Sequence, residues 1–282
     1  MIHIRSLIGV FIIPIIIAGC DFLSNQPIAP DQASEKGIKD VSGIHEKLDV
    51  LEPDSTSDPE DTIKIPADSS TSITNRVLID GSKDGGVWWF PQAGIFDTSA
   101  DHQGKAFAER LRSEGYLVDE LGRDHLITEG LLEHYNIIIR ANGFEPYQPS
   151  EVDAYRKAIE RGITLVLLSD HKKYAPDDPV ENLLGIKFTG VVSGTIVDFE
   201  DSPLTKNLKS LDIIGGSYIS DVNIPGLLPL ARIYLPELAR NKVVMALLQN
   251  PTSRIFLMGD VNAIEFMPEP FTSNLIRWIG SE

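Results

Sequence analysis

One segment limits the possible folds of this chain more than any other, the apolar run ITLVLLSDH at residues 163–171. A strand this apolar must be covered on both faces, which is typical of a central strand in a parallel sheet. Around it the hydrophobic pattern changes repeatedly between the periods of a strand and a helix. Strands are predicted at 76–80, 116–121, 136–142 and 163–171, and helices between them at 104–115, 128–135 and 150–161. This alternation predicts an α/β fold with helices on both faces of a mostly parallel sheet.

The predicted helices carry start and stop signals. Thr128 opens the second helix, and Ser150 is the predicted N-cap of the third, which Gly162 ends. In that third helix one face carries apolar side chains, which are predicted to point inward: Val152, Tyr155 and Ile159.

The later part of the chain has a different hydrophobic pattern. Between residues 185 and 235, short apolar groups alternate around Gly and Pro without helical spacing, which predicts a β-rich insertion, either a hairpin or an extra sheet edge. Strands are predicted again at 242–250 and 254–260, and a final helix at 271–280. We therefore expect one domain with a continuous core over 73–282.

The N-terminus has the pattern of a leader peptide. Residues 7–19 are uninterruptedly apolar or small, too short a run to span a bilayer as a helix but suited to a secretory signal. The sequence Ile17-Ala18-Gly19-Cys20 resembles the bacterial lipoprotein box, which implies cleavage before Cys20 and lipidation of that residue. Several acyl chains would hold the protein stably at a membrane of the cell envelope. The alternative is an ordinary signal peptide, or a membrane helix with an incidental cysteine.

The segment that follows Cys20 is rich in Pro, Ser, Asp and Glu. Residues 21–72 contain 12 acidic residues against 4 lysines, and the whole chain has a formal charge of −16. The small apolar surface of this segment cannot offset the entropy lost when the segment becomes ordered. Residues 20–72 are therefore predicted to be a lipidated cysteine followed by a disordered tether. Clustered Lys and Arg are needed to bind nucleic acid, and their scarcity argues against a nucleic-acid partner. Asp21 resembles an inner-membrane retention signal, but the sequence does not decide between the inner and the outer membrane.

Polar residues gather where the predicted strands end. Ligands of an open parallel sheet bind beyond the carboxyl ends of its strands. Acid, imidazole and amide side chains at this edge are what a polar ligand or a metal ion requires, although such residues also cap helices and close turns. The ligand-binding candidates are Asp80, His102, Gln103, Asn142, Asp170, His171, Asp260 and Asn262.

Known catalytic and cofactor motifs are absent from the sequence. There is no P-loop, no H-E-x-x-H, no zinc spacing of paired histidines and no G-x-S-x-G elbow, so no cofactor and no catalytic residue is assigned. Trp88, Trp89 and Phe90 form an aromatic run that could stack on a sugar or cover the open edge of a sheet.

Several segments together resemble one family. The chain is similar to the glutamine-amidotransferase-like domain of the gliding-motility ABC-transporter auxiliary protein, of intraflagellar-transport proteins and of many bacterial envelope proteins. The resemblance spans most of 76–282 and is strongest over 127–171, and it rests on VLIDGSKD, HQGKAFAERLRSEGYLVDEL, ITEGLLEHYNIIIRANGFEPYQPSEVDAYRKAIERGITLVLLSDH, NLLGIKF, SRIFLMGDVNAIEF and SNLIRWI. It implies a flavodoxin-like fold of the class I glutamine-amidotransferase type.

The single cysteine decides what the resemblance implies about catalysis. Class I amidotransferases need a nucleophilic thiolate on a strand-to-helix elbow, yet this chain has no cysteine after Cys20 and no serine elbow after LLSDH. The amidotransferase reaction is therefore excluded, and the resemblance implies a non-catalytic relative used for binding or assembly.

Two functions remain open. The first is a binding or scaffolding module that the tether presents to an envelope complex, and the resemblance implies an ABC-type transporter as that complex. A module of this kind predicts an exposed apolar patch, such as 88–90 or 213–235. The second is a metal-dependent or carbohydrate-acting hydrolase, in which His102, Asp170, His171 and Asp260 would hold a metal ion that activates water. If the protein's own side chains fill the carboxyl edge of the sheet, the module is favoured.

Overall fold

The computed structural model describes residues 75–83, 102–123, 125–141, 145–172 and 177–281. Five features considered above lie outside these residues: the leader peptide, Cys20, the predicted tether, the aromatic run 88–90 and Asn142.

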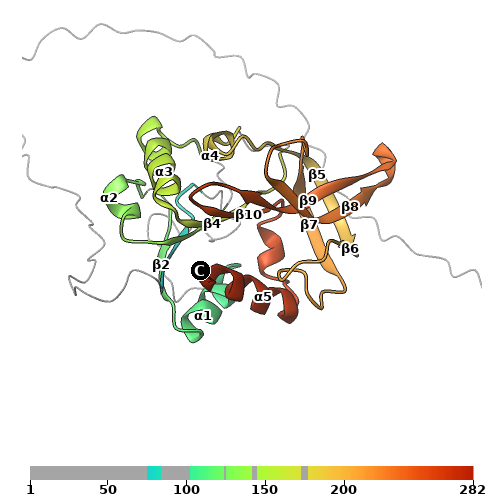
Figure 1. The fold of residues 1–282 in the computed structure, drawn as a ribbon, viewed down its shortest axis with the longest axis horizontal. Helices are drawn as coiled ribbons and strands as arrows, with labels where there is room; N and C mark the ends of the chain where they lie inside the picture. Colours follow the sequence, from blue (N-terminus) through green and yellow to red (C-terminus); the bar gives the residue numbers. More distant parts are fainter. Residues whose placement is uncertain (1–74, 84–101, 124, 142–144, 173–176, 282) are drawn as a thin grey trace, which may run out of the picture. The chain divides into compact units, whose positions relative to one another are not determined.

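Eight strands form the main sheet, in the order β2-β1-β3-β4-β10-β9-β8-β6 (Figure 1). The first five pair in parallel, and the remaining three are antiparallel. With β10 in the fifth place, the parallel part has the strand order of a flavodoxin-like fold. The strands are β1 (Arg76–Asp80), β2 (Leu117–Leu121), β3 (Ile137–Arg140), β4 (Thr164–Leu168), β6 (Asp198–Phe199), β8 (Leu227–Leu235), β9 (Arg240–Gln249) and β10 (Arg254–Met258).

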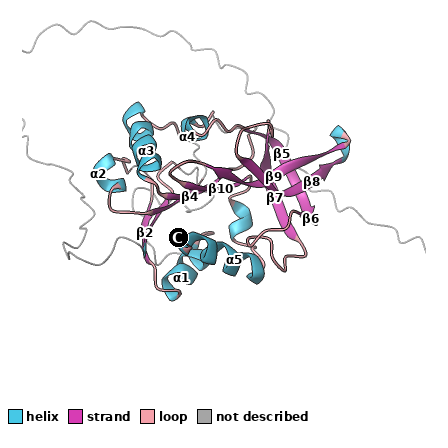
Figure 2. Ribbon diagram, in the orientation of Figure 1, coloured by secondary structure: helices cyan, strands magenta, loops and turns pink. Residues whose placement is uncertain are grey.

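Helices cover both faces of this sheet, as predicted (Figure 2). One face packs against α1 (Lys105–Ser113) and α5 (Glu269–Gly280), and the other against α2 (Glu129–Leu132), α3 (Pro149–Arg161) and α4 (Pro179–Leu183). Each face has its own apolar core because successive residues of a strand point to opposite sides. The predicted fold class is therefore confirmed.

The central strand β4 is buried along its whole length, as its composition predicts. The start of α3, however, was predicted wrongly. Its N-cap is Gln148 rather than Ser150, and Gln148 forms a capping box with Glu151. Pro149 occupies the first helical position, where its fixed φ suits the helix and the missing N–H costs nothing.

The predicted β-rich insertion is present, and it is both an added sheet and an extra sheet edge. Strands β5 (Phe188–Ile196) and β7 (Leu211–Ile219) pair antiparallel in a separate two-stranded sheet. Strands β6 and β8 of the same region extend the main sheet beyond β9. Apolar residues of β5 and β7 belong to the same cores as the main sheet. Among the described helices, none is both long enough and apolar enough to cross a bilayer.

Candidate functional site

Asp80 lies at the carboxyl end of β1 and is 1% exposed. Its carboxylate accepts hydrogen bonds from the Tyr147 hydroxyl at 3.1 Å, from the Tyr155 hydroxyl and from the backbone N–H of Ser82 at 2.9 Å. Burial raises the pKa of both tyrosines well above the ordinary value, so both phenols stay protonated and donate. Asp80 is therefore held inside the protein by its own neighbours.

Arg140 ends the neighbouring strand β3, in register with Asp80, and its side chain is fully buried. Its Nε donates to the Tyr147 hydroxyl at 3.1 Å, and its guanidinium pairs with Asp178, the N-cap of α4. Burial by itself would lower the pKa of Arg140. The negative charge of Asp178 acts in the opposite direction, and the pKa is raised overall, so Arg140 stays a cation. The resulting network fastens α3 and α4 to the ends of the two strands.

A second pair of candidates lies at the carboxyl ends of β4 and β10. Asp170 is 1% exposed and Asp260 is fully buried. Burial, with a smaller contribution from the negative charge of Asp170, raises the pKa of Asp260 to about 6. Backbone N–H groups of Ile214 at 2.6 Å and Asn262 at 2.8 Å bind the Asp260 carboxylate and act in the opposite direction. Burial also raises the pKa of Asp170, which accepts the backbone N–H of His171 at 2.6 Å.

Strand β7 of the insertion lies directly on this end of the sheet. The Ser217 backbone N–H donates to the Gly259 carbonyl at 2.6 Å, and the Asn262 side chain donates to the Ile214 carbonyl at 3.3 Å. A Cβ on Gly259 would come within 2.1 Å of the Ser217 carbonyl oxygen, so only glycine allows this approach. The insertion thereby covers Asp260, which the sequence predicts to be available to a ligand.

His102 occupies a third place, at the start of α1. Its Nε2 lies 3.3 Å from Glu120 of β2, and Arg112 lies 2.5 Å from the same carboxylate. Burial alone would raise the pKa of Glu120, but the hydrogen bonds from His102 and Arg112 lower it overall. Gln103 is half-buried beside this group.

Among the described residues, the contacts of the candidates form three clusters, around Asp80, around the pair Asp170 and Asp260, and around His102. His171 is half-buried beside Asp170. Across the described ranges, no three His, Cys, Asp or Glu side chains are arranged to hold a metal ion, so the four-residue ligand set of the hydrolase hypothesis is not assembled there.

The sequence reasoning missed most of the residues that build these clusters. A usable signal for Arg140 was its place at the end of the apolar run NIIIR, where a charged residue must be buried with a partner. Glu181 gave no comparable signal, although it accepts hydrogen bonds from Ser169 at 3.0 Å and Lys172 at 2.8 Å. The missed residues are Lys83, Arg140, Tyr147, Glu151, Tyr155, Ser169, Asp178, Glu181 and Ser217.

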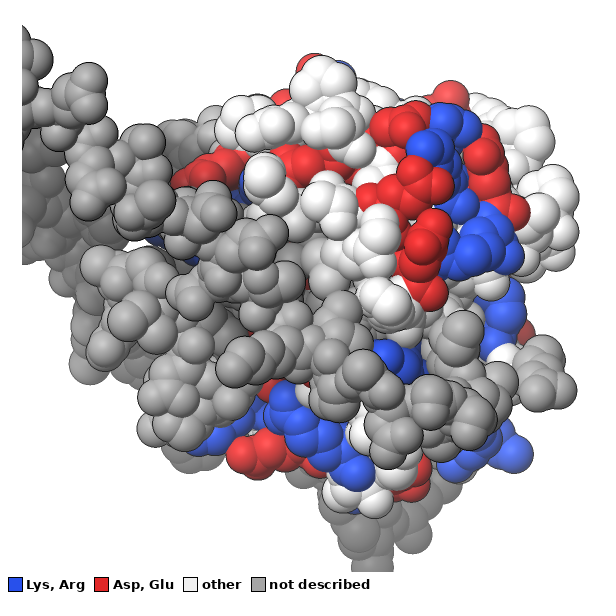
Figure 3. Space-filling view, turned by 90° about the vertical axis from the view of Figure 1, so that its left-hand side faces the viewer, with Lys and Arg blue, Asp and Glu red and all other residues white. Residues whose placement is uncertain are grey.

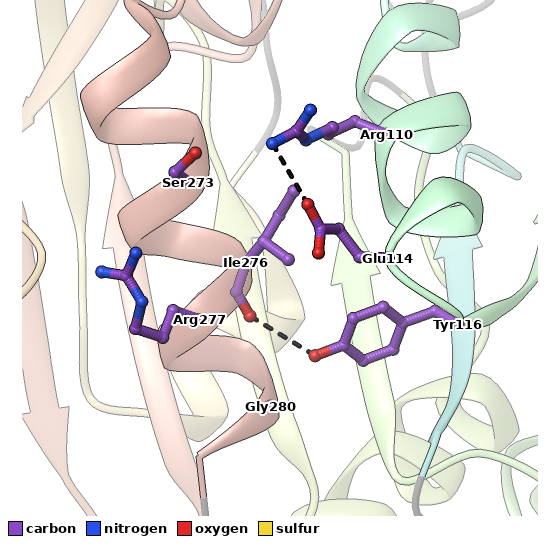
Figure 4. A pocket seen from close by; sticks show the side chains of 7 residues that line it. All are labelled: Arg110, Glu114, Tyr116, Ser273, Ile276, Arg277 and Gly280. Carbon is purple, nitrogen blue, oxygen red and sulfur yellow. Dashed lines mark hydrogen bonds and ion pairs between the residues drawn. The ribbon is translucent and has the colours of Figure 1, made fainter.

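Away from the carboxyl edge, a hollow of about 450 Å³ lies between α1 and α5 (Figure 4). Arg110 reaches Glu114 at 3.1 Å, and the Tyr116 hydroxyl donates to the Ile276 carbonyl at 3.4 Å. The two charges that face each other in this hollow therefore compensate one another.

The charged face that includes α2 and α3 shows Lys and Arg beside Asp and Glu (Figure 3). On α3, Arg156 pairs with Asp153 at 2.5 Å and with Glu160 at 2.6 Å. The charges on this helix therefore alternate in sign and do not form a patch of one sign.

Six exposed large apolar side chains belong to the β-rich insertion. Part of the segment 213–235, one of the two places where a module would carry an apolar patch, is exposed in this way; the other, 88–90, lies outside the described residues. The exposed residues are Val191, Val197, Ile214, Val222, Leu228 and Tyr234.

Comparisons with known proteins bear on the fold. No protein-family profile matches the sequence, and no curated protein matches it significantly. Among solved structures, this chain is similar to the mmIFT52 N-terminal domain, with a TM-score of 0.56 and 13% sequence identity. The match covers 73% of this chain and 98% of that domain. Two ThuA-like proteins have TM-scores of 0.48 and 0.49 at 19% and 12% identity. They come from Bacteroides uniformis and Parabacteroides merdae, and the matches cover 77% and 73% of this chain and 93% and 89% of theirs. The similarity to the mmIFT52 domain agrees with the strand order and concerns the fold alone.

Proposed function

We propose that this chain is a lipid-anchored protein of the bacterial cell envelope whose α/β domain binds or scaffolds a partner without catalysis. One observation carries the proposal: the acids at the carboxyl edge are used internally. Asp80, Asp170 and Asp260 are all at most 1% exposed, and strand β7 covers the last of them. An edge occupied by the protein's own hydrogen bonds favours a module over a hydrolase.

The sequence supplies the other parts of the proposal. Lipidation at Cys20 would tie the chain to a membrane, and the acidic segment 21–72 would hold the domain clear of the lipid headgroups. Association with an ABC-type transporter or another envelope complex rests on the family resemblance, and so does the assignment to a bacterial envelope.

The anchor is tested with the full chain expressed in a bacterial host. We expect the wild-type protein in the membrane fraction, extractable by detergent, with a mass that fits cleavage before Cys20 and added acyl chains. Cys20→Ser is the matched control and should lack the acyl mass. Equal masses, apart from the substitution, and equal partitioning of the two proteins would contradict lipidation.

The choice between module and hydrolase is tested at the carboxyl edge. Asp170→Asn removes a charge from the candidate hydrolase site, and Asp153→Asn on the exposed face of α3 is the control. For a module, neither substitution changes the partners cross-linked in cells, and EDTA does not change the melting temperature of the purified chain. Turnover of glycoside or phosphate-ester substrates that Asp170→Asn abolishes, while Asp153→Asn does not, would favour the hydrolase.

A further inference from the structure

Strand β8 has a partner along only part of its outer edge. It pairs with β9 as far as Leu235 and Arg240, but β6 pairs with it only at two positions, Ala231 and Arg232. Within the described residues, the segment 233–235 therefore has a strand on one side and none on the other. An edge of this kind presents backbone N–H and C=O groups that an added strand can bind.

A groove of about 260 Å³ follows this open edge. The chain passes from β5 through Val197 into β6, which pairs with β8, and the groove lies between the end of β5 and the distal half of β8. Residues of β5, β6, β8 and β9 line the groove together with Val197, among them Gly194, Asp198, Arg232, Tyr234 and Asn241.

The walls of the groove expose apolar surface. Val197 is 72% exposed and Tyr234 is 57% exposed. Valine and tyrosine are among the side chains that pack well against cross-strand neighbours. Apolar contacts are therefore available beside the open backbone groups.

The opposite edge of the main sheet is protected in a way that β8 is not. Strand β2 forms that edge, and Arg112 donates to the Val118 carbonyl at 3.1 Å while pairing with Glu120. A charged side chain bonded to the backbone blocks the approach of another strand. Of the two edges of the main sheet, the one at β8 is therefore where strand addition is expected.

The charge of the groove indicates what kind of segment would bind. Arg232 is paired with Glu200, so its positive charge is compensated. Asp198, which lines the groove, has no ion-pair partner in the described part of the chain, whereas Arg240 and Lys242 belong to β9, on the other side of β8. The carboxylate of Asp198 therefore lies at the open edge without a cation and favours a partner with positive charge.

We propose that an extended segment of another polypeptide, with Lys or Arg beside β-branched or aromatic residues, adds as a strand to the open edge of β8. The proposal rests on the proposed function as a binding module and names the surface and the partner chemistry. Backbone hydrogen bonds would give affinity, and contacts with Val197, Tyr234 and Asp198 would give selectivity. A second copy of this chain is a poorer occupant, because pairing at this edge would bring like carboxylates together.

The test uses the full chain in a non-ionic detergent and hydrogen exchange of the backbone amides of 231–235. The probe is a short synthetic peptide in which Lys and Val alternate. Two control peptides have Glu in place of Lys, or Pro in place of the central Val residues. We expect the Lys peptide to slow exchange in this segment, and both controls to bind about tenfold more weakly or not at all.

Two charge-reversed variants sharpen the test. Asp198→Lys should reverse the preference from the Lys peptide to the Glu peptide, whereas Glu109→Lys, at an exposed position of α1, makes the same change in net charge and should leave the preference unaltered. Protection elsewhere in the chain, or equal binding of the Pro peptide, would overturn strand addition at β8. Protection of 231–235 without peptide, together with a dimer in sedimentation, would assign the edge to a second copy and also overturn the proposal.

Failure of this inference is distinguishable from failure of the proposed function. If the Lys peptide does not bind, but partners are still cross-linked in cells and Asp198→Lys leaves them unchanged, the module binds through another surface. Turnover that depends on Asp170 would instead contradict the module itself, whatever the peptide does.

Discussion

The ends of β1 and β3 and the ends of β4 and β10 bury charge in different ways. At the first pair, Asp80 and Arg140 lie in register with Tyr147, Tyr155 and Asp178 around them, so cation, anions and hydroxyl donors occur together. At the second pair, two acids lie near one another and are bonded mainly by backbone N–H groups. At this second pair burial raises the pKa of Asp260 to about 6.

The two places differ in what compensates the buried carboxyl groups. A nearby guanidinium offsets the cost of removing a carboxylate from water, whereas backbone N–H groups do so only in part. The first cluster therefore holds the strand ends and helices in place. In the second cluster, Asp260 binds a proton more tightly than it would in the unfolded chain.

The largest effect is expected from removing the cation of the first cluster. Arg140→Met leaves Asp178 buried without its partner, and loss of one member of a buried pair costs about 3–5 kcal/mol of unfolding free energy. Urea unfolding of the purified chain measures this loss. Arg156→Met, on the exposed face of α3, is the control and should unfold close to wild type, since exposed ion pairs contribute little.

Equal losses in the two variants would remove the contrast between buried and exposed charge. A stable Arg140→Met protein would mean that the cluster adjusts when its cation is removed, and that it does not lock the strand ends.

The second prediction concerns pH. Because folding raises the pKa of Asp260 from 3.8 to about 6, the folded protein binds this proton more tightly than the unfolded chain. Its stabilising contribution is complete below about pH 3.8 and is lost as the pH rises through about 6, which amounts to about 3 kcal/mol. The free energy of unfolding of wild type relative to Asp260→Asn should therefore fall across this window and be constant above it.

Urea unfolding at a series of pH values measures this difference. Asp170→Asn should move the window to lower pH, because one source of negative charge beside Asp260 is removed. A wild-type difference that does not change between pH 4 and 6 would contradict the raised pKa.

The third prediction tests the contact that closes the second cluster. Gly259→Ala would place a methyl group 2.1 Å from the Ser217 carbonyl oxygen, so the backbone of β7 or β10 must move, at a cost of about 1–3 kcal/mol. The matched control is Gly130→Ala on α2, where the added methyl group meets no neighbour within 4 Å and alanine favours the helix. Thermal unfolding should show opposite signs, and equal shifts would mean that β7 does not press on this edge.

The candidate site could be predicted from the sequence only in part. The polar residues at strand ends identified the carboxyl edge, because periodicity places strand ends and strand ends share an edge in a parallel sheet. The partners came from elsewhere in the chain: Tyr147 from the loop before α3, Tyr155 from the middle of α3, and Asp178 from the N-cap of α4. Hydrogen-bond partners depend on side-chain directions and on the packing of distant segments, which periodicity does not encode.

The sequence by itself determined the layered α/β fold, the buried central strand and the β-rich insertion, because alternating hydrophobic periods fix which faces must be covered. It also contains a single cysteine, and that at residue 20. Only the tertiary structure decided that β7 closes over Asp260, that Asp80 is bound by two phenols, and that β8 keeps an open edge. These outcomes depend on where the insertion packs, and contacts between residues far apart in the chain set that position.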